Sequence, residues 1–135
     1  MTPEEFKART KKFAIRILRL ADSLPRTPSG RALSGQIADC GTSVASNYRA
    51  ACKARFRKEF VAKLGVAEEE ADETQFWLEL IMESGLVQTQ RLRPLHSEAC
   101  EITAMTAASR KPAAAKLLSG AAKSEPAVAR ATASG

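Results

Sequence analysis

The sequence has few cysteines, histidines and aromatic residues, and each of these low counts argues against one class of protein. Its 135 residues include three cysteines and one histidine. An odd number of widely spaced cysteines without a Cys-x-x-Cys pair predicts reduced thiols rather than a disulfide framework. A single histidine excludes the paired Glu-x-x-His motifs of di-metal helix bundles, so we expect no metal. Aromatic residues make up only 5%, which disfavours a turn-rich all-β fold.

Long hydrophobic runs and catalytic motifs are also missing. Residues 13–21 are interrupted by Arg16 and Arg19, so no segment is predicted to span a membrane. The first residues are acidic and lack the apolar core of a signal peptide. There is no recognisable nucleophile–base pair or glycine-rich phosphate loop, and the length leaves no room for a cofactor domain. We therefore expect a cytoplasmic protein that is not an enzyme and holds no cofactor.

Apolar residues recur at spacings of three and four, which predicts four helices. The expected helices cover residues 3–23, 28–53, 56–84 and from about 89 to 111. The steps Thr2-Pro3 and Thr27-Pro28 each combine an N-cap with a proline at the first helical position. The clearest stripe consists of Phe60, Leu64, Ala67, Ala71, Thr74, Leu78 and Ile81.

The connections between these helices are short, which makes consecutive helices antiparallel neighbours. The predicted fold class is all-α, an up-down-up-down four-helix bundle over residues 1–111. Residues 112–135 are rich in Ala, Ser, Lys and Pro, and we expect them to form a flexible, disordered tail.

Two features inside the second predicted helix call for packing explanations. Gly35 and Gly41 each cost roughly 1 kcal/mol relative to alanine, so we expect a neighbouring backbone to approach closely there. Asn47 falls in an apolar stripe, where it either fixes the register of the helices through hydrogen bonds or contacts a ligand. The predicted polar core consists of Gln36, Ser43, Asn47 and Glu73.

The third predicted helix carries the one tryptophan of the chain. Trp77 lies beside the stripe residue Leu78, at the flank of the predicted core. Tryptophan is enriched in subunit interfaces, so Trp77 is a candidate anchor for self-association.

The net charge of +6 conceals two oppositely charged regions. Residues 1–58 have a balance of +9, whereas residues 59–85 have a balance of −7. In an antiparallel bundle, the starts of the first and third helices meet the ends of the second and fourth. We call this end the basic pole; it gathers Lys7, Arg9, Lys11, Lys12, Arg49, Lys53, Arg55, Arg57, Lys58, Arg110 and Lys111.

The basic pole has three interpretations. It can bind the phosphate backbone of RNA or DNA, pair with the acidic third helix of another subunit, or remain solvated without a specific role. The candidate nucleic-acid contacts are Lys11, Lys12, Arg49, Lys53, Arg55, Arg57 and Lys58. Because no base-reading motif is present, any nucleic-acid binding is expected to depend on the backbone or on shape.

A series of short motifs resembles a known family. The motifs are Leu24-Pro25, Gln36, Ser43-Val44, Asn47-Tyr48, Arg55, Glu59-Phe60 and Leu64, followed by residues 70–74 and 77–79. Their order resembles that in the four-helix-bundle proteins of 23S ribosomal RNA intervening sequences, over about residues 10–87. The sequence departs from the family at Phe56, where a serine usually caps the third helix, and at Arg49-Ala50-Ala51, where an acid and a glycine are usual.

The resemblance implies both a fold and a set of partners. Members are antiparallel bundles that assemble into homopentamers, and most have no established activity. A relative is the accessory variability protein of diversity-generating retroelements, which binds a reverse transcriptase and RNA through a basic surface. The resemblance therefore implies three partners: further copies of this chain, RNA or DNA, and a reverse transcriptase.

Overall fold

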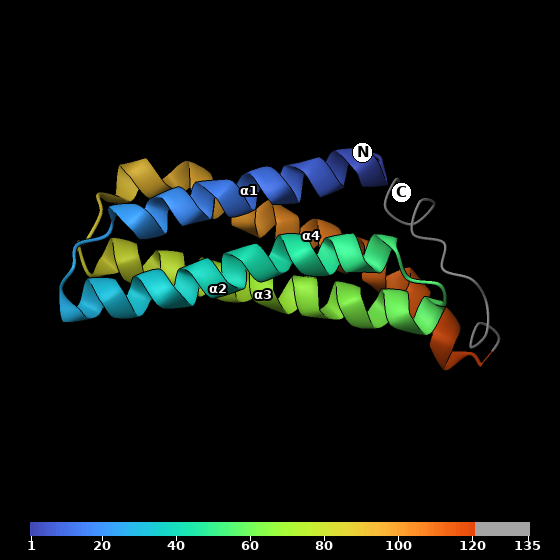
Figure 1. Cartoon of the computed structure of the whole chain (residues 1–135). Coiled ribbons are helices and arrows are strands. Elements are labelled where there is room, and N and C mark those ends of the chain that lie inside the picture. Colours follow the sequence, from blue (N-terminus) through green and yellow to red (C-terminus); the bar gives the residue numbers. More distant parts are fainter. Residues whose placement is uncertain (121–135) are drawn as a thin grey trace.

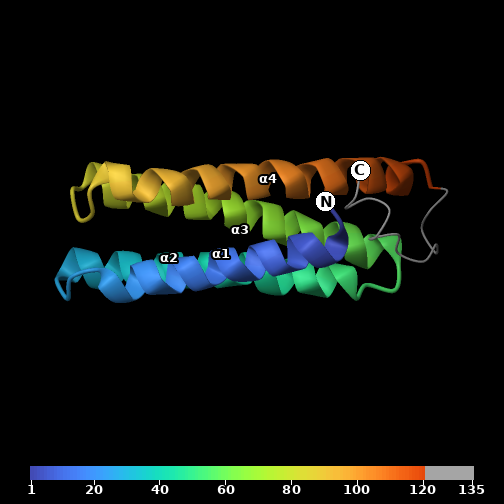
Figure 2. The same cartoon turned by 90° about the horizontal axis from the view of Figure 1, so that it is seen from above.

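The computed structural model describes residues 1–120, which form four helices and no strand. In chain order these are α1 (Pro3–Ser23), α2 (Pro28–Cys52), α3 (Arg57–Glu83) and α4 (Thr89–Leu118). They run up, down, up and down along a common axis (Figures 1 and 2). Helix α1 packs on α2, α2 on α3 and α3 on α4, whereas α1 and α4 meet at few points. The predicted all-α, up-down-up-down bundle is confirmed.

The two predicted Thr-Pro caps form as expected. The Thr2 hydroxyl accepts a hydrogen bond from the Glu5 amide, and the Glu5 carboxylate accepts one from the Thr2 amide in return. The Thr27 hydroxyl accepts from the Gly30 amide at 3.1 Å. Both caps satisfy N–H groups that have no partner inside the helix. They explain why α1 and α2 begin where the sequence predicts.

The start of α3 shows the effect of the unusual Phe56. Phe56 occupies the N-cap position and makes no capping hydrogen bond with its side chain. The carboxylate of Glu59 instead accepts a hydrogen bond from the Arg55 amide at 3.3 Å. At the other end, Gly85 follows α3 with a φ of 78°, a conformation that favours glycine and stops the helix.

The predicted end of the fourth helix is wrong. Helix α4 continues through Pro112 to Leu118, although proline lacks the N–H needed for the helical hydrogen bond. Buried Ala113 continues the apolar face of α4, and the surrounding alanines favour helix, which offsets the effect of the proline. The bundle therefore includes part of the expected tail. The rest of that tail, residues 121–135, lies outside the described residues.

The core follows the predicted apolar stripes. All seven predicted stripe positions of α3 are buried. Ile17, Ile37, Val44 and Ile102 bring the other three helices to the same core, and each is fully inaccessible to solvent. The ring of Phe6 meets that of Tyr48 edge-on, with their centres 4.7 Å apart, at the basic pole. Burial of these side chains supplies the main stabilisation of such a bundle.

The predicted polar core is wrong for two of its four members. Gln36 and Glu73 are exposed because each lies one position away from a buried residue, Ile37 or Thr74. Ser43 and Asn47 are half-buried, and the Asn47 amide donates to the Ser43 carbonyl within the same helix at 2.9 Å. That bond links no two helices, so it does not fix their register.

A threonine forms the polar contact between α2 and α3 instead. The hydroxyl of Thr74, which is fully buried, lies 3.2 Å from the sulfur of Cys40 on α2. The same hydroxyl donates to the Glu70 carbonyl at 2.7 Å, so its polar group is satisfied in the core.

One arginine links α1 to α4, a pair of helices that meet at few points. The guanidinium of Arg9 donates two hydrogen bonds of 2.7 Å to the carboxylate of Glu98. A third contact, at 3.3 Å, reaches the more exposed Glu101. Paired hydrogen bonds between arginine and a carboxylate are among the stronger polar interactions in proteins. We call this group the α1–α4 clasp.

The clasp predicts a pH-dependent stability. The hydrogen bonds from Arg9 hold the pKa of Glu98 below its usual range. The carboxylate therefore stabilises the fold above the ordinary glutamate pKa, and this contribution disappears as the pH falls through the lowered value. We expect Glu98→Gln to lower the free energy of unfolding by about 1 kcal/mol at pH 7 and by much less near pH 3.5.

Urea unfolding of both proteins across this pH range measures the effect. Glu101→Gln is the control, because that carboxylate is 62% exposed and should contribute little at any pH. If Glu98→Gln lowered the free energy of unfolding equally at both pH values, the proposed role of the clasp would be contradicted.

Candidate nucleic-acid interface

The fold brings the basic pole together as expected. Figure 1 shows the N-terminus, the connection between α2 and α3, and the end of α4 at the same end of the bundle. Three of the basic residues there are paired with acids. Arg9 belongs to the α1–α4 clasp, Arg110 contacts Glu68 at 2.6 Å and Lys7 contacts Glu4 at 3.1 Å. The charge available to a ligand is therefore smaller than the sequence total.

The structure removes Arg57 from the candidate nucleic-acid contacts. Its side chain is only 2% exposed, at the first position of α3. The reason is helical spacing, because Arg57 lies three residues before Phe60 and seven before Leu64, on the buried stripe. This spacing was present in the sequence and indicates a buried position despite the charge.

A hollow between α1 and α2 contains the main group of accessible cations. We call it the basic groove; its charged walls are formed by Lys7 and Lys11 of α1, by Arg49 of α2 and by Lys53, which caps the end of α2. The groove has a volume of about 580 Å³, and among the described residues Glu4 is the one acid that lines it. Among the described residues, no ion pair is formed by Lys11, Arg49 or Lys53, and all three are exposed.

Helical spacing explains how the groove forms. Thr42, Ser46, Arg49 and Lys53 follow one another at steps of four, three and four, so they share one face of α2. Ala8 and Ala45 contribute only methyl groups, which leaves space between the charged side chains. The hydroxyl-bearing wall of Thr42 and Ser46 was not predicted from the sequence, although the same spacing rule could have identified it.

The remaining candidates lie outside the groove. Lys12 is exposed and close enough to Glu98 to help lower the pKa of that carboxyl. Arg55 places its guanidinium 6.0 Å from the centre of the Phe56 ring, and Lys58 is exposed at the start of α3. The seven predicted contacts therefore separate into three groove residues, three peripheral cations and the buried Arg57.

The outer side of α3 offers a surface of a different kind. Phe76 is 51% exposed, and Val66 and Leu80 are also more than a third exposed. Half-buried Trp77 donates from its indole nitrogen to Glu73 at 3.0 Å and meets Phe76 edge-on. These side chains lie among the acids of α3. We call this surface the α3 outer face; it consists of Val66, Glu69, Glu73, Phe76, Trp77 and Leu80.

The cysteines and the histidine do not form a metal site in the described part of the chain. His96 contacts the Glu79 carboxylate at 2.9 Å, and its other ring nitrogen lies 3.8 Å from the Cys100 sulfur. Burial and the nearby Glu79 and Asp72 carboxylates raise the pKa of the Cys100 thiol. A thiol held in its protonated form is a poor nucleophile, so this geometry gives no support for catalysis.

These observations define an all-helical bundle protein that carries a group of accessible cations in a groove between its first two helices. Within residues 1–120, none of the four helices has the extended apolar stretch that a membrane span requires. The family comparison is more specific: the model of the 23S rRNA-intervening sequence proteins matches residues 5–108, and the chain belongs to this family. The match reaches well into α4, beyond the residues that carry the resemblance in the sequence.

One solved structure from Bacteroides thetaiotaomicron is similar over most of its length. It is the crystal structure of a protein of unknown function from the S23 ribosomal protein family, with 31% sequence identity and a TM-score of 0.76. The similarity covers 82% of this chain and 99% of that chain. A comparison with curated proteins finds no match.

Proposed function

We propose that this protein is a cytoplasmic, homo-oligomeric and non-enzymatic accessory factor that binds the backbone of RNA or DNA in its basic groove. The observation that carries this proposal is the convergence of Lys11, Arg49 and Lys53 on one hollow without acidic partners among the described residues. Cations left accessible in a concave surface attract phosphate groups. The name of the family refers to 23S rRNA, which makes RNA the first ligand to test.

The groove suits binding that is not specific for sequence. Its lysines and arginine can pair with phosphates, whereas the hydroxyls of Thr42 and Ser46 already donate to the Ala38 and Ser43 carbonyls of α2. Its described lining residues include no aromatic side chain on which a base could stack. We therefore expect affinity that depends strongly on salt and weakly on sequence.

A triple charge reversal tests the proposal. We expect Lys11→Glu, Arg49→Glu and Lys53→Glu together to weaken binding of a labelled RNA by on the order of 100-fold near 100 mM salt. The slope of log K against log salt should also become shallower by about 2, because three phosphate contacts are lost. Fluorescence anisotropy across a salt series measures both quantities.

The matched control reverses three exposed cations elsewhere, Arg26, Lys63 and Arg93, so that the net charge changes equally. The RNA affinity of this control variant should be much closer to that of the wild type. The proposal would be refuted if both variants lost RNA affinity equally, or if the wild-type protein did not bind RNA.

The second candidate is a protein-binding scaffold without a nucleic-acid role. It is favoured by the α3 outer face, where exposed apolar side chains lie among acids that complement the basic groove of another copy. Native mass measurement of the same triple variants distinguishes the two. If the groove variant loses self-association while the wild type binds no RNA, the scaffold is supported. A reverse transcriptase is a further proposed partner, and it rests on the family resemblance alone.

A further inference from the structure

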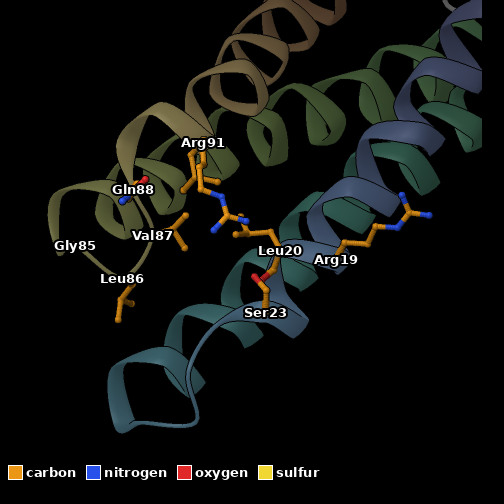
Figure 3. A pocket seen from close by; sticks show the side chains of 9 residues that line it. Arg19, Leu20, Ser23, Gly85, Leu86, Val87, Gln88 and Arg91 are labelled. Carbon is orange, nitrogen blue, oxygen red and sulfur yellow. The ribbon is translucent and has the colours of Figure 1, made fainter.

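A second cavity lies at the end of the bundle opposite the basic pole. It has a volume of about 580 Å³ and lies between the last turns of α1, the α3–α4 connection and the first turn of α4 (Figure 3). Its polar lining includes Arg19, Ser23, Gln88 and Arg91, and Leu20 and Val87 contribute apolar surface. Cavities of this size are common binding sites for small molecules.

The charges along the open side between α1 and α4 change in character towards this cavity. Nearer the basic pole, Arg9 of α1 forms ion pairs with Glu98 and Glu101 of α4. At the far end, Arg19 of α1 is matched by Arg91 of α4, a second cation. Within residues 1–120, neither of these arginines forms an ion pair, and no acid lines the cavity.

Two cations beside one cavity repel each other, and a bound anion would turn this repulsion into attraction. Figure 3 shows the guanidinium of Arg91 extending from α4 towards Leu20 and Ser23 of α1. The side chain of Arg19 leaves the opposite flank of α1 in the same view. Arg19 is exposed and forms no ion pair within residues 1–120, so its side chain can turn towards the cavity when an anion binds there.

We infer that this cavity binds a phosphate monoester carried by an organic group with an apolar face. Guanidinium groups match phosphate oxygens with paired hydrogen bonds, and two of them balance the two charges of a monoester. Leu20 and Val87 supply a surface for the organic part, which inorganic phosphate lacks. The phosphate can come from a free nucleotide or from the phosphorylated end of a nucleic-acid strand.

This site is independent of the basic groove. The two cavities share no lining residue and lie towards opposite ends of the bundle. Binding at the far cavity can therefore occur whether or not the groove binds nucleic acid, and each proposal can fail alone.

Isothermal titration of the full chain with uridine 5′-monophosphate tests the inference. We expect saturable binding of the monophosphate, weaker binding of inorganic phosphate and none of uridine. Arg91→Gln should weaken the monophosphate complex about tenfold or more, because it removes hydrogen bonds to a charged group. Arg93→Gln is the matched control, since Arg93 is exposed two residues further along α4 and does not line the cavity.

A second experiment uses the triple variant of the basic groove, in which Lys11, Arg49 and Lys53 are replaced by glutamate. This variant should bind the monophosphate like the wild type, and in this background a 5′-phosphorylated oligonucleotide is compared with its 5′-hydroxyl form. If the 5′-phosphorylated oligonucleotide binds more tightly, the end of a nucleic-acid strand is a source of the phosphate. If both oligonucleotides bind equally weakly while the monophosphate binds, the ligand is a free nucleotide. The absence of saturable binding up to several millimolar, or equal affinities of the Arg91→Gln protein and the wild type, would overturn the inference.

Discussion

Replacing Gly30 with alanine is expected to destabilise the bundle by more than about 3 kcal/mol. An added Cβ would lie 1.9 Å from the carbonyl oxygen of Pro25 and 2.9 Å from its carbonyl carbon. These are backbone atoms, so no side-chain rotation relieves the overlap. The connection between α1 and α2 must move instead. That movement would also disturb the hydrogen bond from the Gly30 amide to the Thr27 hydroxyl, which caps α2.

A second glycine of the same helix provides the control. Gly35 is exposed, and an added Cβ there would meet nothing within 4 Å. Gly35→Ala should therefore stabilise the protein by about 0.5–1 kcal/mol, because alanine is the better helix former. Urea unfolding followed by circular dichroism measures both variants. Similar midpoints for Gly30→Ala and the wild type would show that the tight turn is not required.

The second large effect is expected at Gly41, which faces α1. An added Cβ would lie 2.6 Å from Cγ2 and 2.9 Å from Cβ of Ile17, a fully buried side chain. The Ile17 Cβ is fixed by its own backbone, so α1 must shift away from α2. We expect Gly41→Ala to cost about 1–3 kcal/mol of unfolding free energy, as overpacked cores do.

A double-mutant cycle separates this contact from the general cost of a new methyl group. Ile17→Ala alone should cost about 2–5 kcal/mol, because it leaves a cavity in the core. The double variant should lose less than the sum of the two single losses, since the smaller side chain makes room for the new Cβ. Additive losses, measured by urea unfolding of all four proteins, would show that Ile17 is not the obstacle.

These two sites also show what the sequence could and could not predict. A glycine inside a helix indicates a special position. At Gly41 a close neighbour is present, but it is the side chain of Ile17 and not the backbone expected from the sequence. The same expectation is wrong at Gly35, where the space is empty. The difference depends on which way each residue faces in the folded bundle, and both glycines look alike in the sequence.

The fold itself was highly predictable, because helical periodicity and caps are local signals. The stripe of α3 and the Thr-Pro starts of α1 and α2 needed no knowledge of distant residues. The end of α4 was not predictable from Pro112 alone, since burial of Ala113 against the bundle outweighs the local cost of the proline.

The candidate sites were less predictable, because they depend on pairs of residues from different helices. Net charge alone could not show that Arg9 is paired with Glu98 and that Lys11 is left accessible. That Arg19 and Arg91 line one cavity likewise follows only from the packing of α1 beside the start of α4. Local patterns predict which face a residue occupies, but only the packed structure shows what it meets there.

The sparse contact between α1 and α4 has a consequence for how the chain folds. Because each helix packs mainly on its neighbour in sequence, most contacts join residues that are close along the chain, and such low contact order is associated with rapid folding. It also leaves α1 held chiefly by α2, with the Arg9 clasp on its other side, so local opening should begin there. A ligand that contacts both α1 and α2 in the basic groove would therefore stabilise α1 against local opening.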